Sequence, residues 1–189
     1  DLHTIHDDIC VDCGLCGYVC PVEAILDYEG NVATRFKKRA DADRIAAELE
    51  RDNTISGQEQ AAAARAMRPT AEAKAEAWEI AMVRDDVPNE TQRSVVLAFQ
   101  QYGQDEVLAP YVEKYLAAAD TMWEDKGTQR ASTALEFIFP KQLASEELLD
   151  RVDAWLESSE ANPAAKRYVR EGRADVARAL AAQERDAHG

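Results

Sequence analysis

The chain has 189 residues, of which 46% are hydrophobic and 31% charged, and its formal net charge is −14. This composition is typical of a water-soluble globular protein, and no window approaches the ~20 apolar residues of a membrane span. The negative charge would repel phosphate backbones and anionic lipids, so nucleic acids and membranes are poor partner candidates. We expect a redox partner protein, a basic protein or an upstream domain instead. Entry at Asp1 without a preceding Met suggests a processed or truncated start, and no secretory signal is recognised.

Two segments of different character follow each other along the chain. Residues 1–34 contain no Lys or Arg and hold all four cysteines, whereas Ala, Glu, Arg and Leu dominate from Asp41 onward. We therefore expect a small first segment over residues 1–33, a linker over 34–43 and a second domain over 44–189. The basic run at residues 35–39 is interpreted as a solvated linker and not as a nucleic-acid patch.

Residues that can cap the N-terminus of a helix recur throughout the second segment. In chain order, the predicted helix starts are Asp41 or Asp43, Ser56, Thr70, Asn89, Thr128, Ser145 and Asn162. Ser56 with Glu59, and Asn89 with Gln92, have the spacing of a capping box. Breaks are expected before Pro69, near Gly103, at Pro110, by Gly127 and at Gly172, which would separate a last helix.

Apolar residues follow these starts at helical spacing and form the candidate core. They are Ile45, Leu49, Trp78, Met82, Val95, Val96, Phe99, Leu108, Tyr111, Val112, Tyr115, Leu116, Phe137, Leu148, Leu149, Val152, Trp155, Leu156, Tyr168, Val169, Val176 and Leu180. The pattern predicts a mainly α fold, an αα-hairpin stack or solenoid of eight or nine amphipathic helices without a strict sequence repeat. Trp78, Trp123, Trp155 and the Phe and Tyr residues are expected in the core and not in a ligand cage.

All four cysteines lie close together, at positions 10, 13, 16 and 20. Such clustering is unlike a disulfide framework and indicates metal binding in a reducing compartment such as the cytoplasm. Cys10, Cys13, Cys16 and Cys20 with Pro21 have the C-x2-C-x2-C-x3-C-P spacing of iron–sulfur ligands. These four cysteines are thus the predicted cofactor-binding and metal-ligating residues, with a 4Fe-4S cluster as the cofactor. Structural zinc, a strained disulfide and a redox-active thiol pair are the less favoured alternatives.

At these residues the first segment resembles one half of a bacterial-type two-cluster 4Fe-4S ferredoxin, from Ile5 through the Cys-Pro-Val-Glu-Ala-Ile run that ends at Ile25. The resemblance implies a ferredoxin-like fold and electron transfer. A full domain of that family has two such motifs that exchange their fourth ligands, whereas this chain has one. Either the other half lies upstream of Asp1, or two chains associate to complete the site, or His3, His6 or a carboxylate supplies the remaining ligand.

The second segment, residues 44–189, resembles the C-terminal helical domain of actinobacterial aminopeptidase N, a zinc metallopeptidase. The resemblance rests on residues 52–54, 57–58, 68–74, 89–92, 139–140 and 153–156, together with Trp78. It implies a bowl of paired helices that covers the active-site cavity and limits which peptides enter, with catalysis in an upstream domain. The three His, at positions 3, 6 and 188, form no H-E-x-x-H motif, so no catalytic residue is predicted. Zinc is expected only if the catalytic domain is present elsewhere.

Three hypotheses of function follow from these segments. The first is an electron-transfer protein in which the helices form a docking scaffold. The second is a substrate-gating fragment of a zinc aminopeptidase that lacks the catalytic domain. The third is an interaction scaffold with a structural cluster. Whether the chain acts as an enzyme stays open at this point.

Overall fold

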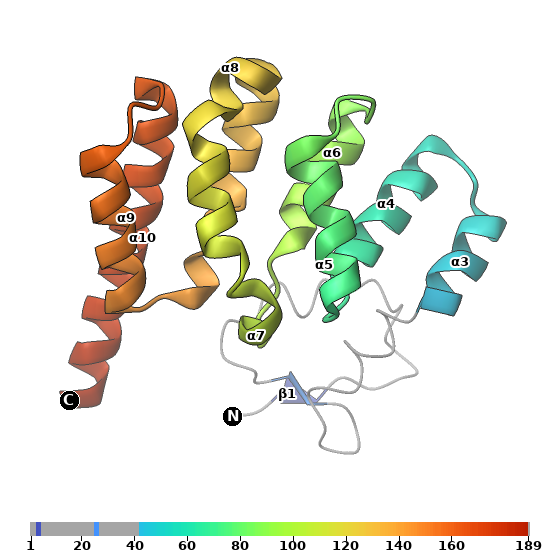
Figure 1. The fold of residues 1–189 in the computed structure, drawn as a ribbon. Coiled ribbons are helices and arrows are strands. Elements are labelled where there is room, and N and C mark those ends of the chain that lie inside the picture. Colours follow the sequence, from blue (N-terminus) through green and yellow to red (C-terminus); the bar gives the residue numbers. More distant parts are fainter. Residues whose placement is uncertain (1–2, 5–24, 27–41, 189) are drawn as a thin grey trace.

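The computed structural model describes residues 3–4, 25–26 and 42–188 (Figure 1). Two short strands, β1 (His3–Thr4) and β2 (Ile25–Leu26), are followed by helices that stand side by side in a row. The α-helices are α3 (Ala42–Arg51), α4 (Ile55–Ala66), α5 (Ala71–Trp78), α6 (Asn89–Phe99), α7 (Asp105–Leu108), α8 (Tyr111–Phe137), α9 (Glu146–Ser158) and α10 (Pro163–His188). A π-helical turn η1 (Glu79–Val83) continues α5, and a 3₁₀ turn η2 (Lys141–Leu143) precedes α9. The described helices confirm the predicted mainly α fold.

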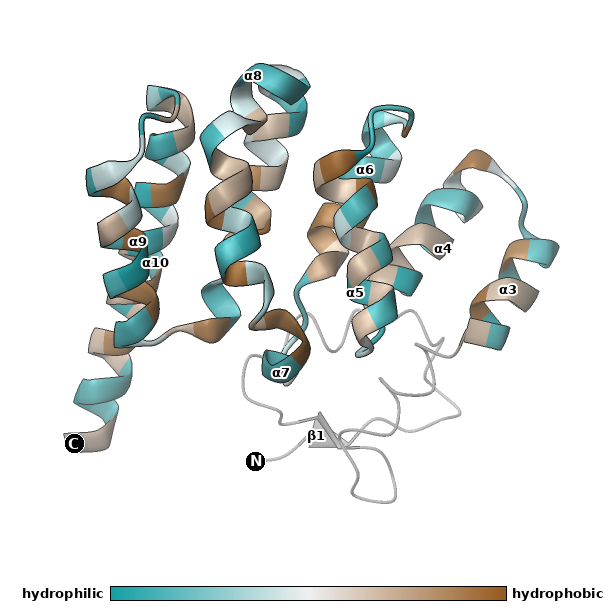
Figure 2. Cartoon of the chain, viewed as in Figure 1, coloured by the Kyte–Doolittle hydropathy of each residue, from teal (hydrophilic) through white to brown (hydrophobic). Residues whose placement is uncertain are grey.

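Stacking of helices along the row builds one continuous core. Helix α4 packs against α6, α6 against α8 and α8 against α10, while α3 lies at one end of the row beside α4 (Figure 1). Each helix carries both apolar and polar residues, as expected when one face is buried and the other faces water (Figure 2). Among the described helices, none is both long and apolar enough to cross a membrane.

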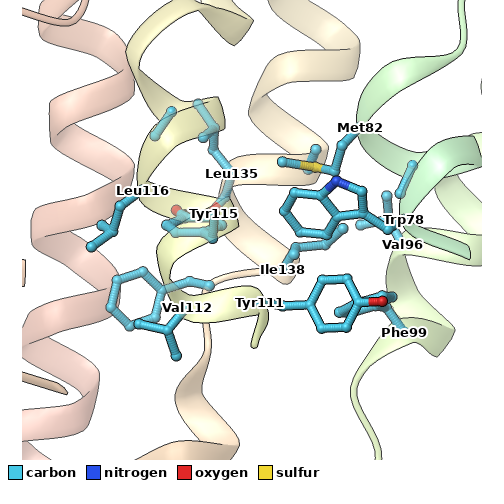
Figure 3. Close-up of a cluster of buried hydrophobic side chains, with 14 of the residues drawn as sticks. Trp78, Met82, Val96, Phe99, Tyr111, Val112, Tyr115, Leu116, Leu135 and Ile138 are labelled. Carbon is cyan, nitrogen blue, oxygen red and sulfur yellow. Dashed lines mark hydrogen bonds between the residues drawn. The ribbon is translucent and has the colours of Figure 1, made fainter. Parts of the chain in front are cut away.

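Aromatic side chains fill the centre of the core where α5, α6 and α8 meet (Figure 3). The ring centroid of Tyr111 lies 5.1 Å from that of Trp78 and 5.1 Å from that of Phe99. Tyr115, one turn further along α8, packs edge-on against Phe139 at 5.5 Å. Burial of such large apolar surfaces is the main force that holds the helices together.

Three of the predicted N-caps are confirmed. The hydroxyl of Thr70 accepts a hydrogen bond from the Ala73 amide at 3.2 Å, and the hydroxyl of Ser145 accepts one from the Leu148 amide at 3.2 Å. Asn162 likewise accepts from the Ala164 amide at 2.9 Å, directly before α10. These bonds satisfy amide groups that have no partner within the first turn of a helix.

Both predicted capping boxes are wrong. Helix α4 begins one residue before Ser56, and its N-cap is Thr54, whose hydroxyl accepts from the Gly57 amide at 3.1 Å. Thr54 is extended there because Asp52 accepts hydrogen bonds from its amide and its hydroxyl. Helix α6 has Pro88 as its N-cap without a side-chain bond, so Asn89 lies inside the first turn.

The predicted breaks divide into those that end a helix and one that does not. Helix α4 ends before Pro69, and Pro110 separates α7 from α8. Gly127, with φ of 73° and ψ of 162°, is not helical and divides α8 into two helical segments, so the predicted helix end at this glycine is confirmed. Gly172, by contrast, lies inside the continuous helix α10, so the expected separate last helix is wrong.

The candidate core residues are mostly buried in the described structure, with two aromatic exceptions. Phe137 is 43% exposed and Tyr102 is 76% exposed, against the expectation that the aromatic residues are core. Trp123 and Trp155 are partly buried against the core. The first helix begins at Ala42, two residues before the predicted domain start at Arg44.

Candidate functional site

The four predicted cluster ligands, Cys10, Cys13, Cys16 and Cys20, lie outside the described residues, as does His6. The structure describes the two strands that flank these cysteines in the sequence, β1 and β2, which pair with each other. The strands are parallel, with His3 opposite Ile25 and Thr4 opposite Leu26.

This pairing brings together the two points where the cysteine-bearing stretch begins and ends. Neighbouring strands lie about 4.8 Å apart, so the chain leaves β1 after Thr4 and returns beside it at Ile25. A parallel pair requires a connection of a dozen or more residues, and residues 5–24 supply it. All four cysteines therefore lie in the sequence between two strands that pair with each other.

The helical part offers no alternative metal centre among residues 42–188. No group of three or more His, Cys, Asp or Glu side chains in that part is placed to hold a metal ion. A surface depression between α4 and α5 has a cavity volume of about 30 Å³, far below the 300–1,000 Å³ of typical ligand sites. Alanines dominate its lining, with Arg65 and Glu76 at its edge.

A buried amine is the chemically most unusual group in the described structure. Lys74 of α5 is 0% exposed, and its Nζ donates hydrogen bonds to the carbonyl oxygens of Ala66 at 2.7 Å and Phe99 at 2.5 Å. It makes no ion pair within the described chain, and burial lowers the pKa of Lys74 to about 8. Its role differs from that of a catalytic amine, because no solvent or substrate reaches it.

Polar side chains satisfy helix C-termini at several other places. The last carbonyl groups of a helix have no partner within the helix. Gln92 donates to Ala81, Gln100 to Phe137 and Phe139, Tyr115 to Leu135, Lys126 to Val83, and Lys166 to Leu156 and Ser159. Burial of the Tyr115 hydroxyl raises its pKa well above the usual value, so it stays protonated as a donor. These bonds tie the ends of η1, α8 and α9 to neighbouring elements of the row.

An ion pair joins the last two helices at the surface. Arg173 of α10 donates two hydrogen bonds of 2.7 Å to the carboxylate of Asp153 in α9. The guanidinium group holds the pKa of Asp153 below its usual value by this hydrogen bonding. Because both side chains are partly exposed, the pair fixes geometry more than it adds stability.

Lys74 and Gln92 are buried polar groups that are absent from the predicted core, although the sequence holds a signal for Lys74. Lys74 stands four residues before Trp78, on the same face of the helix, and the apolar pattern of α5 therefore places it inside. Gln92 has the spacing of a capping-box residue, but its side chain is 1% exposed and donates a hydrogen bond to the carbonyl group of Ala81 in η1. The carbonyl groups that accept hydrogen bonds from Lys74 and Gln92 belong to other helices, so these bonds do not follow from local sequence patterns.

Comparisons with known proteins match the two segments separately. A family described as the ERAP1-like C-terminal domain matches residues 27–178. The chain belongs to the ERAP1-like C-terminal domain family. Aminopeptidase N of Streptomyces lividans is 46% identical over 143 residues, which make up 76% of this chain and 17% of that relative. The resemblance of the helical segment to aminopeptidase N is thereby confirmed.

A 4Fe-4S binding domain family matches residues 3–26, which end where the ERAP1-like C-terminal domain match begins. A ferredoxin of Mycolicibacterium smegmatis is 55% identical over 38 residues, or 20% of this chain and 35% of that protein. The ferredoxin resemblance is confirmed, and it supports iron–sulfur binding. The chain spans well under two thirds of the length of either relative.

Proposed function

We propose that residues 1–33 bind a 4Fe-4S cluster and that the chain transfers electrons. The observation that carries this proposal is the spacing of Cys10, Cys13, Cys16 and Cys20 within the stretch matched by the 4Fe-4S binding domain family. Four thiolates at this spacing fit an iron–sulfur cluster better than zinc, because structural zinc favours two cysteine pairs separated by a longer loop.

The residues between the cysteines suit this role. Gly14 and Gly17 place no side chain between the backbone amides and the ligand sulfurs. Val11, Leu15 and Val19 are apolar and would keep water from the ligands. All of these residues lie in the sequence between the paired strands β1 and β2. When bound, the cluster would supply one-electron transfer.

The fourth ligand depends on what completes the site. In two-cluster ferredoxins, the cysteine that precedes proline serves the other cluster, and this position is Cys20 here. We propose that a second motif, from an upstream segment or from a second copy of the chain, supplies the remaining thiolate. His3, His6 or a carboxylate would be the alternative ligand.

The helical segment would act as a scaffold on which a redox partner docks. A net charge of −14 favours a partner with a basic surface, since opposite charges accelerate association. The linker over residues 34–43 would connect this scaffold to the cluster segment in the cytoplasm. The backbone and side-chain bonds at the helix ends make the described row suited to present a fixed surface.

Anaerobic reconstitution of the full chain with iron and sulfide tests the proposal. We expect bound iron and sulfide in similar amounts and the broad visible absorption of thiolate-bound iron. Cys13→Ser should abolish both, whereas Tyr18→Phe, a change within the motif that removes no ligand, should retain them. Zinc without sulfide in anaerobically purified protein would contradict the iron–sulfur assignment.

A second candidate function follows from the identity to aminopeptidase N over 143 residues. In this reading the helical segment covers the active-site cavity of a zinc aminopeptidase catalytic domain that is supplied separately. The chain itself would hold no zinc, because its sequence contains no H-E-x-x-H motif.

A complementation experiment with a shortened aminopeptidase tests this second candidate function. The S. lividans enzyme shortened by the region that this chain matches should gain aminopeptidase activity when residues 40–189 are added. The chain alone should not hydrolyse aminoacyl substrates even with zinc. Unchanged activity of the shortened enzyme would rule out the gating role, and chelator-sensitive hydrolysis by the chain alone would reveal a site within it.

A further inference from the structure

The amine of Lys74 is placed where three successive helices meet. It extends from α5 to the carbonyl group of Ala66, the last residue of α4, and to that of Phe99, the last residue of α6. Both acceptors are C-terminal carbonyls without partners in their own helices, and both carry the partial negative charge of a helix end. One side chain thereby joins the ends of two helices that pack against each other.

We propose that Lys74 is a proton-linked clamp, in which the amine ties α4 and α6 to α5 and the uptake of a proton by this amine weakens the folded helical domain.

The number of donors and acceptors supports this clamp. A neutral amine has two N–H groups, and the structure provides two carbonyl acceptors for Nζ. An ammonium group has a third N–H, and Nζ makes no third hydrogen bond to the described residues. The ring of Phe99, with its centroid 5.4 Å from Nζ, gives only a weak attraction for the charge.

Among the described residues, no carboxylate makes an ion pair with the Lys74 amine, so only the partial charges of the two helix ends offset the cost of burying its charge. On α4 and α5, Arg65 and Glu76 lie at the surface depression and make no ion pair with the amine. The aromatic cluster on Phe99 includes Tyr111, whose pKa is raised by burial, so its hydroxyl is uncharged. Gln104, the N-cap of α7, is uncharged and donates to the carbonyl group of Met67, the residue after Ala66, at 2.9 Å.

The direction of the pH dependence follows from burial. Burial lowers the pKa of Lys74 from 10.5 in the unfolded chain to about 8 in the folded chain. Between these values the unfolded chain binds more protons than the folded chain, so stability rises with pH. Below about pH 8 the folded chain carries the full cost of a buried charge. The clamp is therefore tightest in alkaline solution.

Urea unfolding of the full chain at several pH values tests the proposal. Relative to Lys74→Met, the folding equilibrium constant of the wild type should rise about fiftyfold from pH 7.5 to pH 10. Lys114→Met provides the matched control, because Lys114 is an exposed lysine that contacts an aromatic ring 4.7 Å away. All other groups are common to the wild type and Lys74→Met, so their contributions to the pH dependence cancel in the ratio of the two equilibrium constants.

Parallel pH curves for the wild type and Lys74→Met would overturn the proposal. If Lys74→Met does not fold, an NMR titration of ¹³C-labelled lysine side chains in the wild type decides instead. A Lys74 signal that titrates near pH 8 supports the clamp, and one that titrates near 10.5 overturns it.

Discussion

Gly172 lies in the middle of α10, where the ring of Phe139 packs directly against its backbone. A Cβ atom at this position would lie 2.4 Å from Cγ of Phe139, which is itself only 1% exposed. The glycine therefore serves close packing between α10 and the segment that follows α8, and it does not end the helix.

We expect Gly172→Ala to lower the free energy of unfolding. Overpacking costs about 1–3 kcal/mol, which exceeds the roughly 1 kcal/mol that alanine contributes through its helix propensity. Urea unfolding followed by circular dichroism measures the difference. Glu171→Ala, an exposed neighbour, should change stability by less than about 0.5 kcal/mol. A Gly172→Ala protein that is more stable than wild type would show that Phe139 moves aside easily.

The cysteines should differ in their contribution to the cluster. Cys20→Ser should reduce the retention of iron less than Cys10→Ser, Cys13→Ser or Cys16→Ser, because the position before proline serves a different cluster in two-cluster ferredoxins. Iron and sulfide content after anaerobic reconstitution and desalting measures retention. Equal loss in all four variants would mean that Cys20 completes the same cluster.

At the scale of the element, two residues near the start of α4 can be compared. Thr54 caps the helix, whereas Ser56 only has the sequence spacing of a cap. Thr54→Ala removes the acceptor of the Gly57 amide and should cost about 1 kcal/mol of stability. Ser56→Ala changes an exposed residue inside the first turn and should cost less than about 0.5 kcal/mol. Thermal unfolding of the two variants compares them directly. A larger loss for Ser56→Ala would restore the capping box as the true start.

The helices were predictable as elements because their signals are local. Thr70, Ser145 and Asn162 each sit directly before an apolar face, so a few consecutive residues suffice to define the start. Two candidates within a few residues of each other, such as Thr54 and Ser56, are harder to separate. Asp52 makes Thr54 the N-cap, because its carboxylate accepts a hydrogen bond from the Thr54 hydroxyl at 2.7 Å and holds Thr54 in the extended conformation.

For the whole molecule, we expect the helical segment to fold without the cluster segment. It has its own caps and a continuous core, whereas a segment of about thirty residues usually requires metal or another chain to fold. A truncation that begins at Ala40 should retain the helical circular dichroism signal and the thermal midpoint of the full chain. Iron chelation should remove structure from the first segment alone.

If the truncation unfolds, or if its midpoint falls by several degrees, the cluster segment must pack on the helices. The chain would then be one integrated domain, and the predicted division at residues 34–43 would be wrong.

The sequence by itself determined the class of fold and the chemistry of the predicted site. Helical spacing of apolar residues predicted the mainly α fold, and cysteine spacing predicts iron–sulfur ligands, since both signals come from residues close together in the chain. Residues 3–26 are similar to 4Fe-4S binding domains, and residues 27–178 are similar to ERAP1-like C-terminal domains.

Only the tertiary structure decided what individual polar and small residues do inside the helices. Lys74 is recognised as a clamp because Ala66 and Phe99 end two other helices beside it. Gly172 is recognised as a packing site because Phe139, from a distant part of the sequence, fills the space of its missing side chain. The physical reason is the same for both: the free energy of a buried group depends on the atoms that surround it, and those atoms come from helices that local sequence signals do not relate to one another.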